Sequence, residues 1–590
     1  MVTFDDVLVE VGSFGPYQKK IFFLIYLTSA MFSYLYVGFV FLAVTPDHWC
    51  RSPGVTGLRD KCNWSLEQEK NYTLPVGRAG SSSYSQCERY DIDWNSSTGS
   101  CKNPLPFVHN GSRDLPLTTC QDGWVFKNGS FPSIVTEFEL VCADAWKVDL
   151  TQACLNLGFM LGTILMGYIA DIFGRKPCFL FASFVTSVSG LLLAFSPSYT
   201  WFVIFRTLQG LFSRGGWLCA YVLITELVVS EYRRIAGILN QLSFSFGIML
   251  LPAVAYFLPA WRNLQLAITI PTFLFLTYYW LIPESPRWIL SQKKDAEAMK
   301  ILQQMAKRNG NALSMKAKTI TIEENSEKMT RPSIVDLVRT PQMRKQTLIL
   351  MVNWFTSALV YQGLVMRLGT LGGNIYLDFF ISGAVEIPAS IIVLLVIERI
   401  GRRLPFAAGG LLSGASCLIA AFIPESVFWL KTAAACLGRL GITVSLEMVC
   451  FVNTELYPTF LRNFAVSVCA ALSDIGGIAA PFIVYRLAAI WVDMPLVVFG
   501  PSTTEVTGEA DSSDGTLSHH RVIGLISGGL VLLLPETKGL TLPDTIEDVE
   551  NIRRWKTCVL KTSYQHIVLH SSTGAHNAKD TASAKIVLNS

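Results

Sequence analysis

The chain has 590 residues, of which 51% are hydrophobic and only 16% are charged, and its mean hydropathy is +0.40. This composition excludes a soluble enzyme and a disordered chain, and it predicts a polytopic membrane protein. The formal net charge is only +4. The positions of Lys and Arg near the ends of spans are therefore more informative than their number.

The N-terminus combines a short charged segment with a long apolar run. Residues 1–20 include Lys19 and Lys20, and residues 21–44 are almost entirely apolar. The run is too long for the core of a signal peptide and lacks a small-residue cleavage site. We therefore expect a cytoplasmic N-terminus over 1–20 and a first transmembrane helix over 21–44.

A polar insert, residues 45–146, separates this helix from the next apolar segment. It holds six of the fourteen cysteines, namely Cys50, Cys62, Cys87, Cys101, Cys120 and Cys142. It also holds five Asn-x-Ser/Thr sequons, at Asn63, Asn71, Asn95, Asn110 and Asn128. Together these features indicate an extracellular, N-glycosylated loop with up to three disulfides, in any of fifteen pairings.

The rest of the chain reads as two groups of apolar spans. Residues 147–283 complete an N-terminal half of six helices, and residues 346–534 form a C-terminal half of six helices. The segment between them, 284–345, carries thirteen Lys and Arg against seven Asp and Glu, which places it in the cytoplasm. The polar residues 535–590 are expected to form a cytoplasmic tail.

Short motifs repeat between the two halves. DIFGR from Asp171 to Arg175 returns as ERIGR from Glu398 to Arg402, and TEL at Thr225 returns at Thr454. PES at Pro283 returns as PET at Pro535, but at an offset larger by about twenty residues. The polar run 501–522 is the obvious insertion, and it interrupts the twelfth predicted span. It leaves an apolar run too short to cross a bilayer core of about 30 Å.

Two repeated halves predict a transporter that binds its substrate between them near mid-membrane and rocks one half against the other. The repeated acid and base suggest a conformational latch at the cytoplasmic face. Its predicted members are Asp171, Arg175, Glu398 and Arg402.

Asp474 stands near the middle of an apolar span and is the strongest single functional signal. An Asp at mid-helix costs roughly 3 kcal/mol on insertion scales, so it normally faces a bundle interior, a cavity or a cation. The C-terminal half has three such acids, Glu386, Glu447 and Asp474, against one base, Arg439. This excess favours a cationic ligand, and we expect Arg439 to be tied to one of the carboxylates.

Aromatic faces attract bulky cations by up to roughly 2 kcal/mol each when desolvated. Suitable rings on the predicted spans are Tyr36, Trp217, Phe244, Trp354 and Tyr361. Any one of them could equally serve in packing or face lipid.

Several long strings carry a family resemblance. GYIADIFGRKP, ELYPTFLRN, PESPRW, WFTSALVYQGLVMRLG, GRLGIT and SDIGGI resemble the organic cation transporters of solute carrier family 22, within the major facilitator superfamily. Among these the chain looks most like the extraneuronal monoamine transporters. The resemblance runs essentially end to end. It implies an all-α membrane protein of twelve helices in two halves that performs polyspecific, sodium-independent, electrogenic transport of monoamines and other organic cations at the plasma membrane.

The resemblance also implies which residues line the cleft. It assigns substrate contacts to Asp474, Glu447, Glu386, Tyr36, Trp217, Gln241, Phe244, Trp354, Tyr361 and Cys450. Two positions depart from the expected pattern. Arg214 stands where Lys is more usual, and Tyr36 stands where Phe is expected.

The sequence shows no nucleotide-binding loop, metal-ligand cluster or catalytic triad spacing, so we expect no enzymatic activity, cofactor, metal or nucleic-acid partner. The predicted partners are small organic cations and the lipid bilayer, with room for a homo-oligomer formed through the extracellular loop. Two alternatives stay open: a sodium-coupled carrier of carnitine-like zwitterions, and a surface protein that does not transport because of the 501–522 insert or because its loop serves as a receptor.

Overall fold

The computed structural model describes residues 4–75, 84–92, 94, 101, 116–127, 131–313, 334–368, 374–424, 427–490, 528–537, 546–547 and 549–550. The sequons at Asn95, Asn110 and Asn128, the 501–522 insert and nearly all of the C-terminal tail lie outside these residues. Within the described part of the chain, ten helices are long and apolar enough to cross a membrane.

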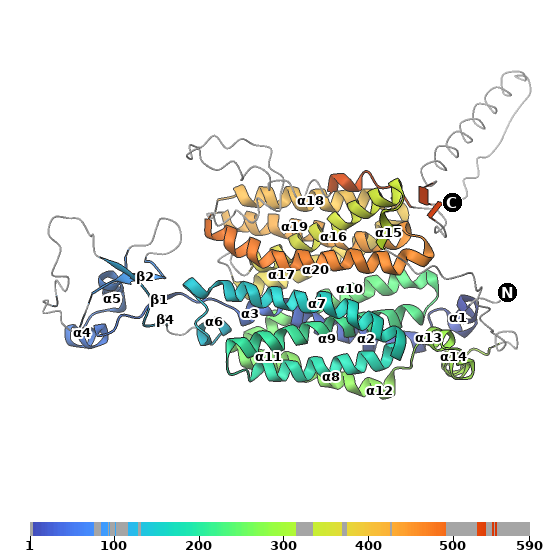
Figure 1. The fold of residues 1–590 in the computed structure, drawn as a ribbon, viewed down its shortest axis with the longest axis horizontal. Coiled ribbons are helices and arrows are strands. Elements are labelled where there is room, and N and C mark those ends of the chain that lie inside the picture. Colours follow the sequence, from blue (N-terminus) through green and yellow to red (C-terminus); the bar gives the residue numbers. More distant parts are fainter. Residues whose placement is uncertain are drawn as a thin grey trace, which may run out of the picture.

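The helices form two groups that lie one above the other in Figure 1. The first group contains α2 (Pro16–Val37), α3 (Phe39–Leu42) and a run of helices that ends at residue 281. The members of that run are α7 (Trp146–Phe173), α8 (Arg175–Ala194), α9 (Tyr199–Glu226), α10 (Ser230–Phe257), α11 (Trp261–Thr269), η2 (Ile270–Thr277) and α12 (Tyr278–Leu281). The last three form one span. Its middle is a 3-10 helix that starts at Ile270, and Pro271, the second residue of that helix, has no backbone N–H to continue α11.

The second group is built in the same way. Its members are α16 (Pro341–Leu368), α17 (Ile375–Arg399), α18 (Arg403–Phe422), α19 (Phe428–Leu456) and α20 (Thr459–Ile490). Residues 528–531 are helical, and Gly528 packs against Ala407 and Leu411 of α18. The two groups meet where α10 packs on α17 and α7 packs on α20.

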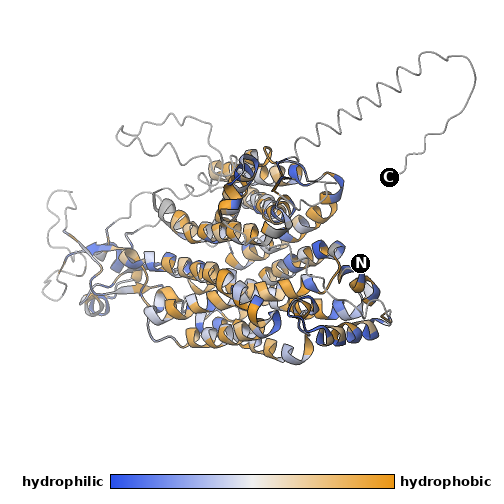
Figure 2. Ribbon diagram, turned by 45° about the vertical axis from the view of Figure 1, so that its right-hand side comes forward, coloured by the Kyte–Doolittle hydropathy of each residue, from blue (hydrophilic) through white to orange (hydrophobic). Residues whose placement is uncertain are grey.

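Hydrophobic residues predominate along the helices of the bundle (Figure 2), and many of them are exposed on its outside. Large side chains such as Phe23, Phe257 and Trp280 are each more than 70% exposed. A soluble protein would not leave so many large rings in water, whereas lipid accommodates them.

A small domain covers one end of the bundle, which we call the loop-domain end (Figure 1). Antiparallel pairing joins β1 (His48–Cys50) to β4 (Trp124–Phe126), and β2 (Glu88–Tyr90) to β3 (Leu117–Thr119). The remaining elements there are α4 (Val55–Cys62), α5 (Leu66–Thr73), α6 (Ile134–Glu137) and the 3-10 turn η1 (Cys142–Asp144).

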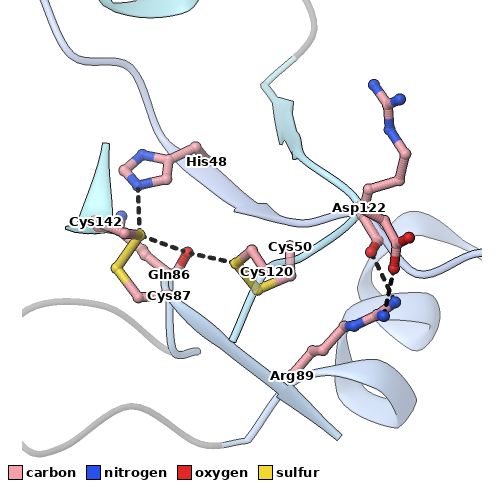
Figure 3. Close-up of a disulfide and its surroundings, with 9 residues drawn as sticks. His48, Cys50, Gln86, Cys87, Arg89, Cys120, Asp122 and Cys142 are labelled. Carbon is pink, nitrogen blue, oxygen red and sulfur yellow. Dashed lines mark hydrogen bonds and ion pairs between the residues drawn. A yellow bond between two sulfur atoms is a disulfide. The ribbon is translucent and has the colours of Figure 1, made fainter. Parts of the chain in front are cut away.

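Three disulfides staple this domain: Cys50–Cys120, Cys62–Cys101 and Cys87–Cys142. Figure 3 shows the Gln86 carbonyl oxygen between two of them, 3.5 Å from Cys142 Sγ and 3.8 Å from Cys120 Sγ. His48 lies beside Cys87 and Cys142, a grouping that could hold a metal only if the disulfide were reduced. Asn63 and Asn71 are exposed, as glycosylation requires.

The opposite end carries the N-terminus together with α1 (Phe4–Gly12), α13 (Pro286–Ser291), α14 (Asp295–Asn309) and α15 (Ile334–Val338), and we call it the α14 end (Figure 1). Asn309 ties these parts together. It accepts a hydrogen bond from the Tyr17 amide at 3.0 Å and donates to Val11 O and Gln18 Oε1.

The repeated motifs build the same joint twice at this end. Glu284 accepts hydrogen bonds from the backbone amides of Arg175 and Lys176 at the start of α8. Glu536 accepts them from Arg402 and Arg403 at the start of α18. A carboxylate suits a helix N-terminus because its amides are unpaired and the helix dipole is positive there.

A glycine precedes the helix in each joint. Gly174 has φ +103° and Gly401 has φ +101°, values that side chains rarely adopt. A Cβ at either position would also lie within 3 Å of the capping glutamate. The offset between PES and PET along the chain therefore leaves the joint unchanged in space.

Candidate functional site

The interface between the two halves contains a cluster of six aromatic rings, which we call the aromatic cluster. Its members are Phe32, Tyr36, Phe159, Trp217, Phe244 and Tyr361. Tyr36 lies at the centre, with ring centroids 5.7 Å from Phe159, 5.9 Å from Phe244 and 6.5 Å from Tyr361. Phe32 stacks on Trp217 at 5.8 Å.

Five of the six rings come from the first half, and Tyr361 on α16 comes from the second. Tyr36, Trp217, Phe244 and Tyr361 were predicted from the sequence, whereas Phe32 and Phe159 were missed. The spacing of Phe32 and Tyr36, one turn apart on α2, is the signal that would have found Phe32. Trp354 lies elsewhere, in the apolar core of the second half with Leu350 and Met448.

Glu386 is fully buried and paired with Arg439, which is 2% exposed, so the base of the second half is tied to a carboxylate as expected. Arg439 Nε donates to Glu386 Oε1 at 3.0 Å, and the guanidinium stacks 3.9 Å from the centre of the Tyr361 ring. Tyr361 and Ser245 donate two more hydrogen bonds to Glu386. These bonds use both oxygens of Glu386, which makes it a group that positions Tyr361 rather than a free counter-charge.

Ser245 brings the first half into this network. Its Oγ, on α10, donates to Glu386 Oε2 at 2.7 Å across the interface. Gln241 lies one turn earlier on α10 and is half-buried. Any movement that separates α10 from α17 must therefore break a buried hydrogen bond to a carboxylate.

Glu447 and Asp474 are two buried acids with spare hydrogen-bonding capacity near the aromatic cluster, and Asp378 at the loop-domain end is a third. Glu447 and Asp474 are each 9% exposed, and Glu447 Oε2 and Asp474 Oδ2 have no hydrogen-bond partner among the described residues. Ser390 donates to the other oxygen of Glu447. A buried carboxylate oxygen without a donor is unfavourable unless a cation or water reaches it.

The positive charge of Arg214 is near enough to Asp474 to attract its carboxylate. The guanidinium of Arg214 lies 4.9 Å from the Trp217 ring and 6.0 Å from the Phe32 ring. Cys450 lies one turn after Glu447 on α19 and is exposed. The predicted acids, Cys450 and the aromatic cluster thus share one region between the halves.

Contacts join the halves at both ends of this region. At the loop-domain end, Phe41 stacks on Tyr376 at 5.8 Å and meets Phe379 at 4.9 Å. At the α14 end, Arg234 of α10 forms an ion pair with Glu398 of α17. The two halves therefore touch on both sides of the aromatic cluster.

The four predicted latch residues split into two kinds. Arg175 pairs with Asp171 at 3.0 Å and with Glu226 at 3.2 Å, and Arg402 pairs with Glu455 at 3.2 Å, all within their own halves. Glu398 alone reaches across to the other half, and its partner Arg234 was not among the predicted latch residues.

Known proteins agree with this architecture. The family model described as "Sugar (and other) transporter" matches residues 82–497. Solute carrier family 22 member 2 of Mus musculus is 52% identical over 94% of this chain and 97% of its own length. The chain belongs to solute carrier family 22. Human member 2 is 52% identical, with 94% and 96% of the two chains covered, and rat member 3 is 49% identical with the same coverage.

A solved structure agrees on the fold. The xylose transporter XylE of E. coli, in a partially occluded inward-open conformation, superposes with a TM-score of 0.53 at 16% identity and covers 89% of this chain and 100% of its own. The predicted all-α major facilitator fold is confirmed. This member of solute carrier family 22 is a multi-pass membrane transporter, and neither its fold nor its relatives are those of an enzyme. The identities do not single out member 3.

Proposed function

We propose that this solute carrier family 22 protein carries organic cations, including monoamines and quaternary ammonium compounds, by facilitated diffusion through alternating access. The observation that carries the proposal is the pair of unpartnered carboxylate oxygens of Glu447 and Asp474, which lie in the same region as the aromatic cluster. Carboxylates supply the opposite charge, and ring faces suit a weakly hydrated cation.

The distribution of charge supports a net negative site. Arg439 neutralises Glu386 by forming an ion pair with it, and the positive charge of Arg214 attracts Asp474. Glu447 has no basic partner among the described residues, so it leaves one uncompensated negative charge between the halves. A monovalent cation can neutralise that charge when it binds and carry its own charge across the membrane when it moves.

Transport of this kind is electrogenic and needs neither ATP nor sodium. A cation carried alone gains about 2.3 kcal/mol per 100 mV of membrane potential. A negative cell interior then concentrates the substrate several-fold. We place the protein in the plasma membrane with the α14 end and both termini in the cytoplasm and the disulfide-stapled domain outside, where Asn63 and Asn71 are open to glycosylation.

The test is uptake of a labelled quaternary ammonium ion by cells that express this chain, at normal and at collapsed membrane potential. Glu447→Gln and Asp474→Asn should each reduce uptake at least tenfold at unchanged surface level by biotinylation. Asp378→Asn is the matched control, because Asp378 is also a buried acid of the second half but lies near the Phe41 contact at the loop-domain end. Saturable uptake that is the same at normal and at collapsed membrane potential would contradict the uniporter mechanism.

A chain without residues 501–522 belongs in the same experiment. Uptake by both forms means that the insert is tolerated, and uptake by the shortened form alone means that this chain is a transport-inactive variant of a cation carrier. Absence of uptake by both forms at the cell surface would overturn the cation site.

One observation favours a second substrate class. The guanidinium of Arg214 lies on the Trp217 ring in the same region as the free acids, so it could receive the carboxylate of a carnitine-like zwitterion. Replacement of sodium separates the two functions, because the zwitterion carrier would lose uptake and the uniporter would not.

A further inference from the structure

A cavity with several polar side chains in a largely apolar lining lies inside the first half. It measures about 60 Å³ and lies between α2, α8, α9 and the α11–η2 segment. Phe32 and Trp217 form one of its walls and belong to the aromatic cluster as well. The cavity is therefore next to the proposed cation site but not part of it.

Three polar groups that line this cavity are unused, and each of them can donate a hydrogen bond. The Thr186 hydroxyl is buried without a partner, and Ser183, one turn earlier on α8, has none among the described residues. Gln209 points its amide oxygen at Arg206 Nη1, at 3.3 Å. Because Arg206 can only donate, the Gln209 amide nitrogen must be the free end, and it too has no acceptor in the described chain.

A buried positive charge, that of Arg206, lies next to two residues that line the cavity. Arg206 is 1% exposed and donates to Gln209 and to the backbone oxygen of Leu35, both of which line the cavity. Neither acceptor carries a charge, Arg206 Nε is unpartnered, and no described carboxylate pairs with this guanidinium. A buried charge normally has a counter-ion.

From this geometry we infer that the cavity binds a small inorganic anion of the size of chloride, held by Thr186, Ser183 and Gln209 and neutralising Arg206. Hydroxyl and amide donors beside a guanidinium suit an anion, and they suit a metal cation poorly because no described residue that lines the cavity is a carboxylate. One water needs only about 10–15 Å³, so the space admits a monatomic anion with some water. Organic ligands of drug size need several hundred Å³ and are excluded.

The test measures the thermal unfolding midpoint of the purified full-length protein in chloride, bromide and gluconate at constant ionic strength. Chloride and bromide should raise the midpoint with a saturable dose response, and gluconate should not. Thr186→Val keeps the side-chain shape but removes the donor, and it should weaken the apparent halide affinity about tenfold. Thr207→Val is the matched control, because its hydroxyl donates within α9 to Val203 and does not line the cavity.

Direct location of bromide by anomalous scattering gives an independent reading, with density expected beside Thr186 Oγ1. Equal midpoints in halide and gluconate would mean that the cavity holds only water and would overturn the inference. A halide response that survives unchanged in Thr186→Val, or bromide found only elsewhere, would do the same. Uptake of organic cations is not used as a readout, so failure of this site is distinguishable from failure of the proposed transport.

Discussion

Arg234 of α10 and Glu398 of α17 form an ion pair that joins the two halves at the α14 end. The side chains are 40% and 55% exposed, so water competes for both charges. A pair of this kind is worth up to about 1 kcal/mol. Such a contact can bias a conformational equilibrium without locking it, which is what a repeatedly opening gate requires.

We predict that Arg234→Glu opens the α14 end. Two facing carboxylates repel, and the ratio of molecules closed at that end to molecules open there should fall by about fivefold. Accessibility of an introduced cysteine near the α14 end to a charged thiol reagent measures the change. The combined Arg234→Glu and Glu398→Arg variant should restore the wild-type rate of cysteine labelling. Equal labelling rates in all three proteins would rule out the gate.

The buried pair of Glu386 and Arg439 should respond very differently. Arg439→Met removes the one base that pairs with the fully buried Glu386 in the described part of the chain, and breaking such a pair typically costs about 3–5 kcal/mol. We expect little protein at the surface and a large loss of thermal stability. The double variant Glu386→Gln with Arg439→Met removes both charges and should recover much of the stability, which size-exclusion profiles after heating can show. If stability is not recovered, the pair stabilises the protein by packing or hydrogen bonding in addition to neutralising charge.

Tyr36 should act through its ring rather than its hydroxyl. Tyr36→Phe should leave the affinity for a quaternary ammonium ion within about threefold, whereas Tyr36→Leu should weaken it by up to about thirtyfold because a cation–ring contact is worth up to about 2 kcal/mol. Uptake at several substrate concentrations gives the KM. Trp201→Leu, an exposed ring of α9 in the apolar outer surface, controls for the general loss of an aromatic residue.

A pH effect is expected where the loop domain meets the bundle. Burial alone would raise the pKa of Glu137, but hydrogen bonds from Arg262 and Trp261 outweigh it and hold the pKa below its usual 4.5. A lowered pKa contributes stability above the unfolded value, and this contribution disappears as the pH falls through the folded value. The stability difference between wild type and Glu137→Gln should therefore be fully present at pH 7, begin to shrink near pH 4.5 and disappear once the pH is below the folded pKa of Glu137. A difference that is constant over this range would contradict the assignment.

The sequence predicted the repeated architecture well because its signals are local. Apolar runs, the DIFGR and ERIGR motifs and the clustered cysteines each reflect the chemistry of neighbouring residues. Glu226 and Glu455, from the repeated TEL motif, hold Arg175 and Arg402 in equivalent positions.

The site was harder to predict because it depends on distances between helices. Three acids and one base in the second half indicated that Arg439 would be paired, but not that Glu386 would be its partner. Phe159 has no feature in sequence that separates it from a lipid-facing ring. Only the packing of α7 against α20, where Asn156 donates to the Gly477 carbonyl at 2.7 Å, carries it to the interface.

The joints made by Glu284 and Glu536 give the molecule an internal comparison. Each fastens the end of one half to the start of its third helix, through the same atoms and beside the same kind of glycine. Replacing Glu284 removes the joint of the first half and leaves that of the second half intact, and replacing Glu536 does the reverse. The two single variants thus report which half must stay stiff for turnover, with each half serving as the reference for the other.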